Sequence, residues 1–274
     1  MRLIKSKVEL INQGNSIEDI YRHIELCGRV CYKSEDKITP DSAKEFVDRM
    51  INSEHGAMLE HGTVYLTMPL QSEEVHKYIM NPYSKVNSVT LDDSDSSAYI
   101  TTNYRVLVEH NWLDDLKYLC EPTEHHEKRI TVKFTCDRGV SHEFVRHRVF
   151  SFAQESTRFC NYSKDKFGNE ITFIQSNYFT DNNSTKIDEP NINYFEQSLK
   201  DSERYYFKLL ELGWKPQQAR QVLPNALKTE LVMTGFRSDW DHFFELRCAK
   251  NAHPDAQKLA NELKDIIDGS EEIR

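Results

Sequence analysis

Strand-type and helix-type patterns are interspersed along this chain of 274 residues, without a strict alternation. A doubly wound parallel sheet would require that alternation. The order therefore favours an α+β fold, with one mixed domain over 1–274 and a central sheet flanked by helices. Period-2 patterns predict strands over 64–69, 98–109, 130–136 and 226–235, and apolar stripes predict helices over 17–32, 40–54, 141–149, 191–212, 215–224, 238–249 and 254–269.

Several helix starts have capping residues in the sequence. Thr39 and Pro40 suit the first turn of the second helix, and Ser141 can cap the helix over 141–149. Ser238 with Asp241 resembles a capping box for the helix over 238–249. These residues predict where the three helices begin.

Two polar stretches, 81–98 and 180–190, are expected to be loops because they are rich in Ser, Asn and Asp. The formal net charge of −9 argues against nucleic acid or an anionic membrane as a partner. No apolar run is long enough to span a membrane, and the first residues lack a signal-peptide core, so a cytoplasmic protein is expected.

A cationic stretch, RHRVFSFAQESTRF, begins at Arg146 within this acidic chain. Arginine offers a rigid fork for phosphate, and hydroxyl and amide groups can complete the shell around it. A nucleotide is the simplest ligand with such groups. A short R-H-R alone is more often a solvated basic face or a set of ion pairs, but the longer pattern through Arg158 is more specific.

The segment RHRVFSFAQESTR resembles the signature of the flavin-dependent thymidylate synthases. EHGAMLEH, ARQVLP and FFELRCAKNAHPDAQ resemble further elements of that family, in the same order, while 81–130 is the least diagnostic part and a candidate family-variable insertion. The signature positions that match are Arg146, His147, Arg148, Ser151, Ser156 and Arg158.

The resemblance implies methylation of dUMP to dTMP. Methylenetetrahydrofolate would supply the carbon, and NADPH would supply reducing equivalents through bound FAD. The family fold is α+β and non-Rossmann, and members are typically homotetramers whose active sites are shared between subunits. No metal is expected.

The resemblance also assigns roles by position, with Arg247 as the catalytic arginine beside the pyrimidine ring. The flavin-binding residues would be His55, Arg146, His147, Arg148, Gln154, Arg237 and His242. The dUMP-binding residues would be Glu143, Arg146, Gln154, Glu155, Ser156, Thr157, Arg158, Arg220 and Arg247. The chain departs from the family pattern at three positions. It has Gln154 where members often have Glu, Ala153 where Asn is common, and Phe159 where Tyr is usual. The spacing between Arg237 and Arg247 also differs from that pattern.

An arginine also suits the chemistry of pyrimidine methylation. Carbon five of the ring must become electron-rich, which other thymidylate synthases achieve by attack of a cysteine. None of the six cysteines lies in the signature, and an arginine at a ring carbonyl can stabilise an anionic ring instead. Ser156 has no evident base beside it in the sequence, which favours binding over nucleophilic attack.

Two other classes of function fit parts of the sequence. His125, His126, His142 and His147 could indicate a metal hydrolase, but no HExxH spacing occurs. A noncatalytic RNA-binding protein could stack bases on Phe144, Phe150, Phe152 and Phe159, although their spacing suits a buried face equally well. The chain has no G-x-G-x-x-G or Walker loop, which disfavours a Rossmann flavoprotein.

Overall fold

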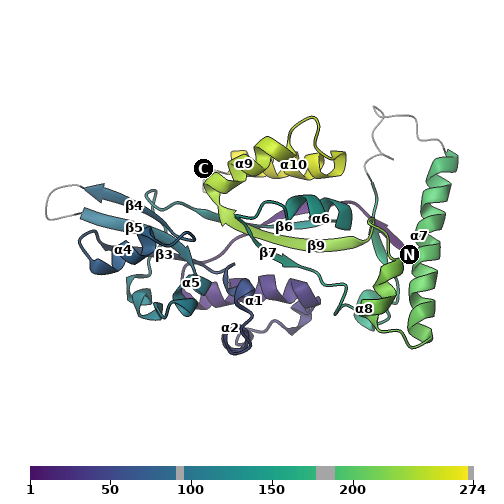
Figure 1. Cartoon of the computed structure of the whole chain (residues 1–274), viewed down its shortest axis with the longest axis horizontal. Helices are drawn as coiled ribbons and strands as arrows, with labels where there is room; N and C mark the ends of the chain where they lie inside the picture. Colours follow the sequence, from purple (N-terminus) through teal and green to yellow (C-terminus); the bar gives the residue numbers. More distant parts are fainter. Residues whose placement is uncertain (91–95, 177–188, 271–274) are drawn as a thin grey trace.

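The computed structural model describes residues 1–90, 96–176 and 189–270, in which helices combine with three β-sheets (Figure 1). This mixture agrees with the α+β class, while the single-domain assignment stays a prediction. In chain order the elements are β1 (Arg2–Ile4), β2 (Lys7–Ile11), α1 (Ile17–Tyr32), η1 (Glu35–Lys37), α2 (Ser42–Asn52), α3 (Gly56–Leu59), β3 (Thr63–Pro69), α4 (Glu73–Ile79), β4 (Lys85–Thr90), β5 (Ser96–Asn103), α5 (Tyr104–Glu109), η2 (Leu113–Tyr118), β6 (Arg129–Asp137), α6 (Arg138–Phe144), β7 (Ser151–Gln154), η3 (Asp165–Phe167), β8 (Thr172–Ile174), α7 (Glu189–Glu211), α8 (Pro216–Ala219), η5 (Arg220–Val222), β9 (Lys228–Phe236), α9 (Arg237–Arg247) and α10 (Pro254–Gly269), where η marks a 3-10 helix.

The central sheet has the strand order β2-β6-β9-β7, and each neighbouring pair is antiparallel. Helices α6, α9 and α10 lie on one side of this sheet and α1 on the other (Figure 1). Val132 and Phe134 of β6 pack with Trp240 of α9 and Leu259 of α10 in one buried cluster. Helices therefore cover both faces of the sheet (Figure 1).

The second sheet has the order β3-β5-β4 and forms one end of the molecule (Figure 1). The loop predicted over 81–98 is wrong for 85–90 and 96–98, because β4 pairs along β5 with Val86 opposite Ile100. Residues 91–95 lie outside the described part of the chain. β4 is an edge strand, and one face of an antiparallel sheet can remain solvated. Its polar side chains therefore resemble those of a loop when only the sequence is considered.

The strand predicted over 98–109 is correct only in its first half. β5 ends at Asn103, whose side-chain oxygen accepts the Val106 N–H at 3.2 Å and caps α5. The remaining residues of the predicted strand form that helix. A short helix that follows a strand leaves too few residues for a 3.6-residue period to show.

Two helix starts also differ from the predictions. α2 begins at Ser42, after Thr39 and Pro40, and the Thr39 N–H donates to Ser42 Oγ at 2.9 Å. α9 begins directly after β9, and Asp239 accepts the Phe236 N–H at 3.2 Å. α2 thus begins without a side-chain cap, and at α9 Asp239 takes the place of the expected pair of Ser238 with Asp241.

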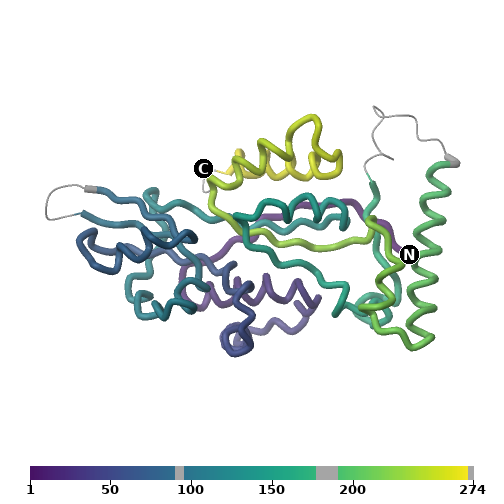
Figure 2. The backbone as a smooth tube through the Cα atoms, in the orientation of Figure 1, coloured from purple at the N-terminus to yellow at the C-terminus, as the bar shows by residue number. Residues whose placement is uncertain are grey.

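The long helices α1, α7 and α10 and the strands β3, β6 and β9 are confirmed with small shifts at their ends. The loop predicted over 180–190 lies outside the described residues, apart from the first two residues of α7. Figure 2 shows that the N-terminal strand β1 runs beside β8, and Arg2 pairs in parallel with Thr172. No helix in the described part of the chain is long and apolar enough to cross a membrane.

Candidate active site

The cationic tripeptide Arg146–Arg148 lies in the turn between α6 and β7. The prediction that a helix capped by Ser141 carries it is wrong. The Asp137 carboxylate accepts the Val140 N–H at 2.7 Å and caps α6, which then ends at Phe144. The chain turns back there to pair β7 with β9. Arg146, His147 and Arg148 therefore lie on a turn and not on a helix.

Arg247, at the end of α9, is held against this turn by three hydrogen bonds. Its Nη1 donates to Glu143 Oε2 at 2.5 Å, its Nη2 to the Glu143 carbonyl at 2.6 Å, and its Nε to His147 Nε2 at 2.9 Å. Only 14% of the Arg247 side chain is exposed. The structure thus brings together Glu143, His147 and Arg247, which we call the Arg247 cluster.

His147 is buried, and this sets its protonation. Burial, with the nearby cationic Arg247 as the next cause, lowers the pKa of His147 to about 4. The imidazole is therefore neutral at neutral pH, and its Nε2 lone pair can accept the Arg247 N–H. The ring packs 5.0 Å from the ring of Phe243. A neutral, packed imidazole fixes the direction of the guanidinium.

Arg146 and Arg148, on either side of His147, are exposed. Across the described ranges neither makes a hydrogen bond or an ion pair. Arg148 lines a cavity of about 390 Å³ together with Val149, Phe150 and Ser151. Arg148 is therefore available to an anionic ligand in this cavity.

A second group of predicted residues lies at the other end of β7. Arg220 Nη1 donates to Thr157 Oγ1 at 3.0 Å, and Arg158 Nε donates to Gln217 at 3.3 Å. The Ser156 hydroxyl accepts the Arg158 N–H at 3.2 Å. We call Ser156, Thr157, Arg158 and Arg220 the Arg220 cluster. The four residues of β7 span about 10 Å between the two clusters.

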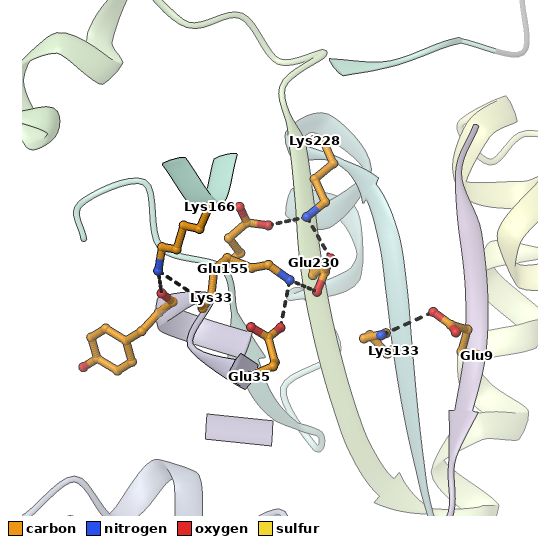
Figure 3. Close-up of polar contacts among 9 residues, drawn as sticks. Glu9, Lys33, Glu35, Lys133, Glu155, Lys166, Lys228 and Glu230 are labelled. Carbon is orange, nitrogen blue, oxygen red and sulfur yellow. Dashed lines mark hydrogen bonds and ion pairs between the residues drawn. The ribbon is translucent and has the colours of Figure 1, made fainter. Parts of the chain in front are cut away.

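A network of charged side chains, most of them largely buried, includes Glu155, the residue before Ser156 (Figure 3). Lys228 Nζ contacts carboxylates of Glu155 and Glu230, each at 2.8 Å. Lys33 Nζ contacts Glu230 at 2.9 Å and Glu35 at 2.8 Å. These five residues, which we call the Lys33–Lys228 network, join the C-terminal end of α1 to β9 and to the segment after β7.

The pKa values of the two central carboxylates of the network, Glu155 and Glu230, are shifted in opposite directions. Burial alone would raise the pKa of Glu230, but Lys228 and Lys33 lower it to about 2. Burial raises the pKa of Glu155, and Lys228 opposes that shift. The Glu155 side chain is 3% exposed and faces the network. This arrangement favours a positioning role for Glu155 over the predicted contact with dUMP.

Gln154 is also engaged within the chain. Its Nε2 donates to Ser141 Oγ at 2.9 Å and to Thr229 Oγ1 at 3.3 Å. Glu155 N–H donates to the Glu230 carbonyl at 2.8 Å, and Ser156 N–H to the Cys31 carbonyl at 2.9 Å. The backbone at the end of β7 is therefore fixed by bonds on both sides.

Three predicted flavin-binding residues, His242, Arg237 and His55, lie outside the Arg247 cluster. His242 has its ring centroid 6.2 Å from that of His147. Arg237 pairs with Asp241 at 2.5 Å, and His55 is exposed at the start of α3. The roles of these residues stay predictions.

Each of the six cysteines is a free thiol whose pKa lies above its usual value, with burial as the main cause. The Cys160 pKa, for example, is raised to about 12. Thiols with raised pKa are poor nucleophiles at neutral pH. In the described ranges no group of three or more His, Cys, Asp or Glu side chains could hold a metal ion.

A match to a family model shows to which family this chain belongs. The family model described as "Thymidylate synthase complementing protein" matches residues 93–269, which is more than half of the chain. The chain belongs to this family. The matched range contains both clusters of the candidate site.

Curated relatives support membership of the thymidylate synthase complementing family. The flavin-dependent thymidylate synthase of Geobacter sulfurreducens is 30% identical over 132 residues, which cover 48% of this chain and 53% of that protein. The enzyme of the same name from Pyrococcus abyssi is 27% identical over 139 residues, 51% of this chain and 54% of its own. A probable flavin-dependent thymidylate synthase of Paramecium bursaria Chlorella virus 1 is 28% identical over 142 residues, 50% of this chain and 65% of its own. The chain spans about half the length of the first two of these relatives.

The residues around the Arg247 cluster fit a flavin. Arg146 and Arg148 are unpaired cations within the described part of the chain, and Arg148 borders the cavity of about 390 Å³. Phe150 supplies an apolar wall of that cavity, and its ring would lie 2.4 Å from a Cβ added to Gly235. Gly235 is therefore required for the close approach of this ring to β9.

Apart from Glu155, the residues of the Lys33–Lys228 network were not predicted from the sequence. Lys228 and Glu230 lie two residues apart on one strand and so share a face, which a strand pattern could have shown. Lys33 is nearly two hundred residues away from them in sequence, and its contact with Glu230 arises only from folding. No local signal indicates that pair.

Proposed function

We propose that this chain is a flavin-dependent thymidylate synthase that methylates dUMP to dTMP. Methylenetetrahydrofolate is the carbon donor in this proposal, NADPH the reductant and FAD the bound cofactor. The family match and the names of the relatives support this class of reaction.

The single observation that carries the proposal is the immobilised Arg247. A guanidinium has five N–H donors, and three hydrogen bonds hold this one to Glu143 and His147. Two N–H donors remain for a carbonyl of the pyrimidine ring. Because arginine stays charged at all relevant pH values, Arg247 would stabilise negative charge as it develops on the ring.

The cysteines support the same route. A methylene carbon needs two more electrons to become a methyl group, and the flavin, when bound, would supply them as a hydride. The ring must also be made electron-rich at carbon five. All six thiols have raised pKa values, so stabilisation by Arg247 accounts for activation better than cysteine attack does.

The Arg220 cluster is suited to bind the phosphate of dUMP. Arg158 is exposed, and Arg220 is oriented by Thr157 at 3.0 Å. Within the described residues no histidine, lysine or carboxylate hydrogen-bonds the Ser156 hydroxyl, so we assign that hydroxyl to binding. Guanidinium forks with neighbouring hydroxyl donors are typical of phosphate sites.

The separation of the two clusters supports an active site shared between subunits. Within one chain the Arg247 and Arg220 clusters lie at opposite ends of β7. A homotetramer could place the Arg247 cluster of one copy opposite the Arg220 cluster of another. Neighbouring cations in the Arg146–Arg148 turn could then serve different sites.

The test is the loss of turnover on substituting Arg247. The purified protein should be yellow, bleach with NADPH and release tritium from dUMP labelled at carbon five. We expect Arg247→Ala to lower kcat about a hundredfold or more, because one electrostatic donor to the transition state is removed. Its flavin content, measured by absorbance, should fall far less.

The matched control is Arg204→Ala, because Arg204 is exposed on α7 and pairs only with nearby residues. It should retain both turnover and flavin. If Arg247→Ala lost flavin while methylation of dUMP continued, the assignment would be wrong. A wild-type protein that cannot be loaded with any flavin would overturn the proposed function as a whole.

A further inference from the structure

The cavity beside Arg148 has a second wall that the flavin-binding signature does not include. Pro82, Tyr83, Lys85 and Arg129 line it, and all four lie in the segment 81–130. This segment is the least diagnostic part of the sequence. The structure places two of its cations, Lys85 and Arg129, at the same cavity as Arg148.

Arg129 is a buried cation whose charge is not paired with a carboxylate among the described residues. Its Nη1 donates to the Glu60 carbonyl at 3.0 Å and to Thr63 Oγ1 at 3.4 Å. Its Nε is buried and has no hydrogen-bond partner. Burial lowers the pKa of Arg129 to about 10, so it is still charged at neutral pH. A buried charge without a counter-ion is unfavourable, and a bound anion would compensate it.

Lys85 approaches the same place from β4. Its Nζ lies 2.5 Å from Ser238 Oγ, 3.5 Å from Glu127 and 4.6 Å from the centre of the Phe236 ring. The Arg129 guanidinium lies 5.6 Å from the centre of that ring. The two cations therefore converge on the Phe236 side of the cavity.

Two carboxylates that line the cavity offset part of this charge. Glu60 pairs with Arg105 at 2.5 Å. Asp239 accepts the Phe236 N–H at 3.2 Å, and burial raises its pKa against the opposing effect of the nearby cations. Three cations therefore line the cavity against two carboxylates, and the exposed Arg148 has no carboxylate partner among the described residues.

We propose that this cavity binds a phosphate group of a dinucleotide cofactor, and that Lys85 and Arg129 supply its cations together with Arg148. The inference rests on the proposed function and gives the 81–130 segment a role in it. FAD and NADPH share the required chemistry, because each carries a pyrophosphate. Guanidinium and ammonium groups around a concave, partly apolar site are typical of phosphate recognition.

The first test compares wild type with Lys85→Met, because Lys85 is partly exposed and its loss should not prevent folding. Affinities for FAD, riboflavin and NADPH are measured by fluorescence titration at constant ionic strength. Loss of one charge-assisted contact should weaken binding of one dinucleotide about tenfold or more, with riboflavin affinity unchanged. A loss confined to FAD assigns the site to the flavin, and one confined to NADPH assigns it to the reductant. Unchanged affinity for both dinucleotides, or an equal loss for riboflavin, would overturn the proposal.

The second variant, Arg129→Gln, tests the buried cation. We expect the rise in Tm that the affected dinucleotide produces in wild type to shrink in this variant, because at a fixed ligand concentration a weaker ligand stabilises the folded state less. If Arg129→Gln does not fold, Lys85→Met decides the question. Lys133→Met is the control, because Lys133 lies on the same strand as Arg129 and pairs with Glu9 at 3.4 Å. An equal effect of Lys133→Met would overturn the proposal.

Inorganic pyrophosphate separates this inference from the proposed function. If wild type binds no flavin but binds pyrophosphate, and Lys85→Met weakens that binding, the phosphate site stands while the thymidylate synthase proposal fails. If wild type is loaded with flavin and methylates dUMP, and Lys85→Met binds FAD and NADPH as tightly as wild type does, the enzyme proposal stands and the phosphate site fails.

Discussion

At the scale of single residues, the site depends on side chains whose protonation states are set by burial and by neighbouring charges. Glu155 shows this most clearly, because its carboxylate is 3% exposed and lies 2.8 Å from Lys228 Nζ. A buried ion pair adds little stability compared with an apolar pair, but removing one partner is costly. Lys228 therefore keeps the start of the Ser156–Arg158 segment in place.

Lys228→Met should destabilise the protein by about 3 kcal/mol, because it leaves two carboxylates, Glu155 and Glu230, without their shared counter-ion. Urea unfolding at pH 7.5 measures this change. Adding Glu155→Gln to the variant should recover part of the loss, since one buried charge is then removed.

Figure 3 also contains the matched control for this prediction, the pair of Lys133 with Glu9. The Lys133 side chain is 28% exposed and the Glu9 side chain is 33% exposed. Lys133→Met should change the free energy of unfolding by less than about 1 kcal/mol. If both lysine variants lost the same stability, the network would not have the role assigned to it.

At the scale of elements, a buried chain of hydrogen bonds joins α1 to the turn between α3 and β3 through the central sheet. His23 Nε2 lies 3.0 Å from Thr131 Oγ1, which lies 2.8 Å from Thr234 Oγ1. His61 Nδ1 lies 2.8 Å from the same Thr234 hydroxyl. Burial lowers the pKa of His23 to about 4 and that of His61 to about 3, with nearby cationic groups as smaller causes. Both rings are neutral at neutral pH.

These two histidines predict a loss of stability in mild acid. In the unfolded chain they bind protons as pH falls below about 6.5, whereas the folded protein resists protonation until about pH 4 for His23 and about pH 3 for His61. The unfolded state therefore binds more protons, and stability decreases as pH falls from about 6.5 to 4. His23 alone should contribute about 3 kcal/mol of this loss by pH 4.

Urea unfolding between pH 7.5 and 4.5 checks this slope. His23→Gln should make the slope shallower, because one group no longer titrates on unfolding. His76→Gln is the control, since His76 is exposed on α4. A His23→Gln slope as steep as that of wild type would contradict the prediction. His147 and His126, whose pKa values are also lowered by burial, should leave part of the slope in place.

At the scale of the whole molecule, one copy of the chain does not unite its two clusters. β7 separates the Arg247 cluster from the Arg220 cluster, and the described residues show no contact between them. Exposed Arg146 and Arg148 extend from the turn at one end of β7, and exposed Arg158 lies beyond the other. A closed homo-oligomer could pair unlike ends of neighbouring copies.

Mixed oligomers test this arrangement. Arg247→Ala and Arg158→Ala should each lack turnover alone. After the two variants are dissociated and reassembled together, about a quarter of wild-type turnover should return, because random pairing restores that share of sites with both clusters intact. Tritium release from dUMP measures it.

The control for this experiment mixes Arg247→Ala with a chain that carries both substitutions. No site in that mixture has an intact Arg247 cluster, so turnover should stay absent. Sites formed within single chains would give no recovery in the first mixture, even where light scattering shows that the two variants have assembled together.

The sequence by itself determined the features that depend on local order. Helices such as α1 and α10 and strands such as β6 and β9 carry their own apolar period, so their type and approximate ends could be predicted. The R-H-R signature and Arg247 were singled out by their resemblance to a family, and the range that the family model matches contains both.

Only the tertiary structure decided the features that depend on pairing across the chain. β4 is a strand because it pairs with β5, and α6 is capped by Asp137 rather than by Ser141 because the end of β6 places that carboxylate over the Val140 N–H. Arg247 meets Glu143, and Lys33 meets Glu230, only after folding. Contacts between residues distant in sequence depend on how elements pack, and no local period or cap encodes that packing.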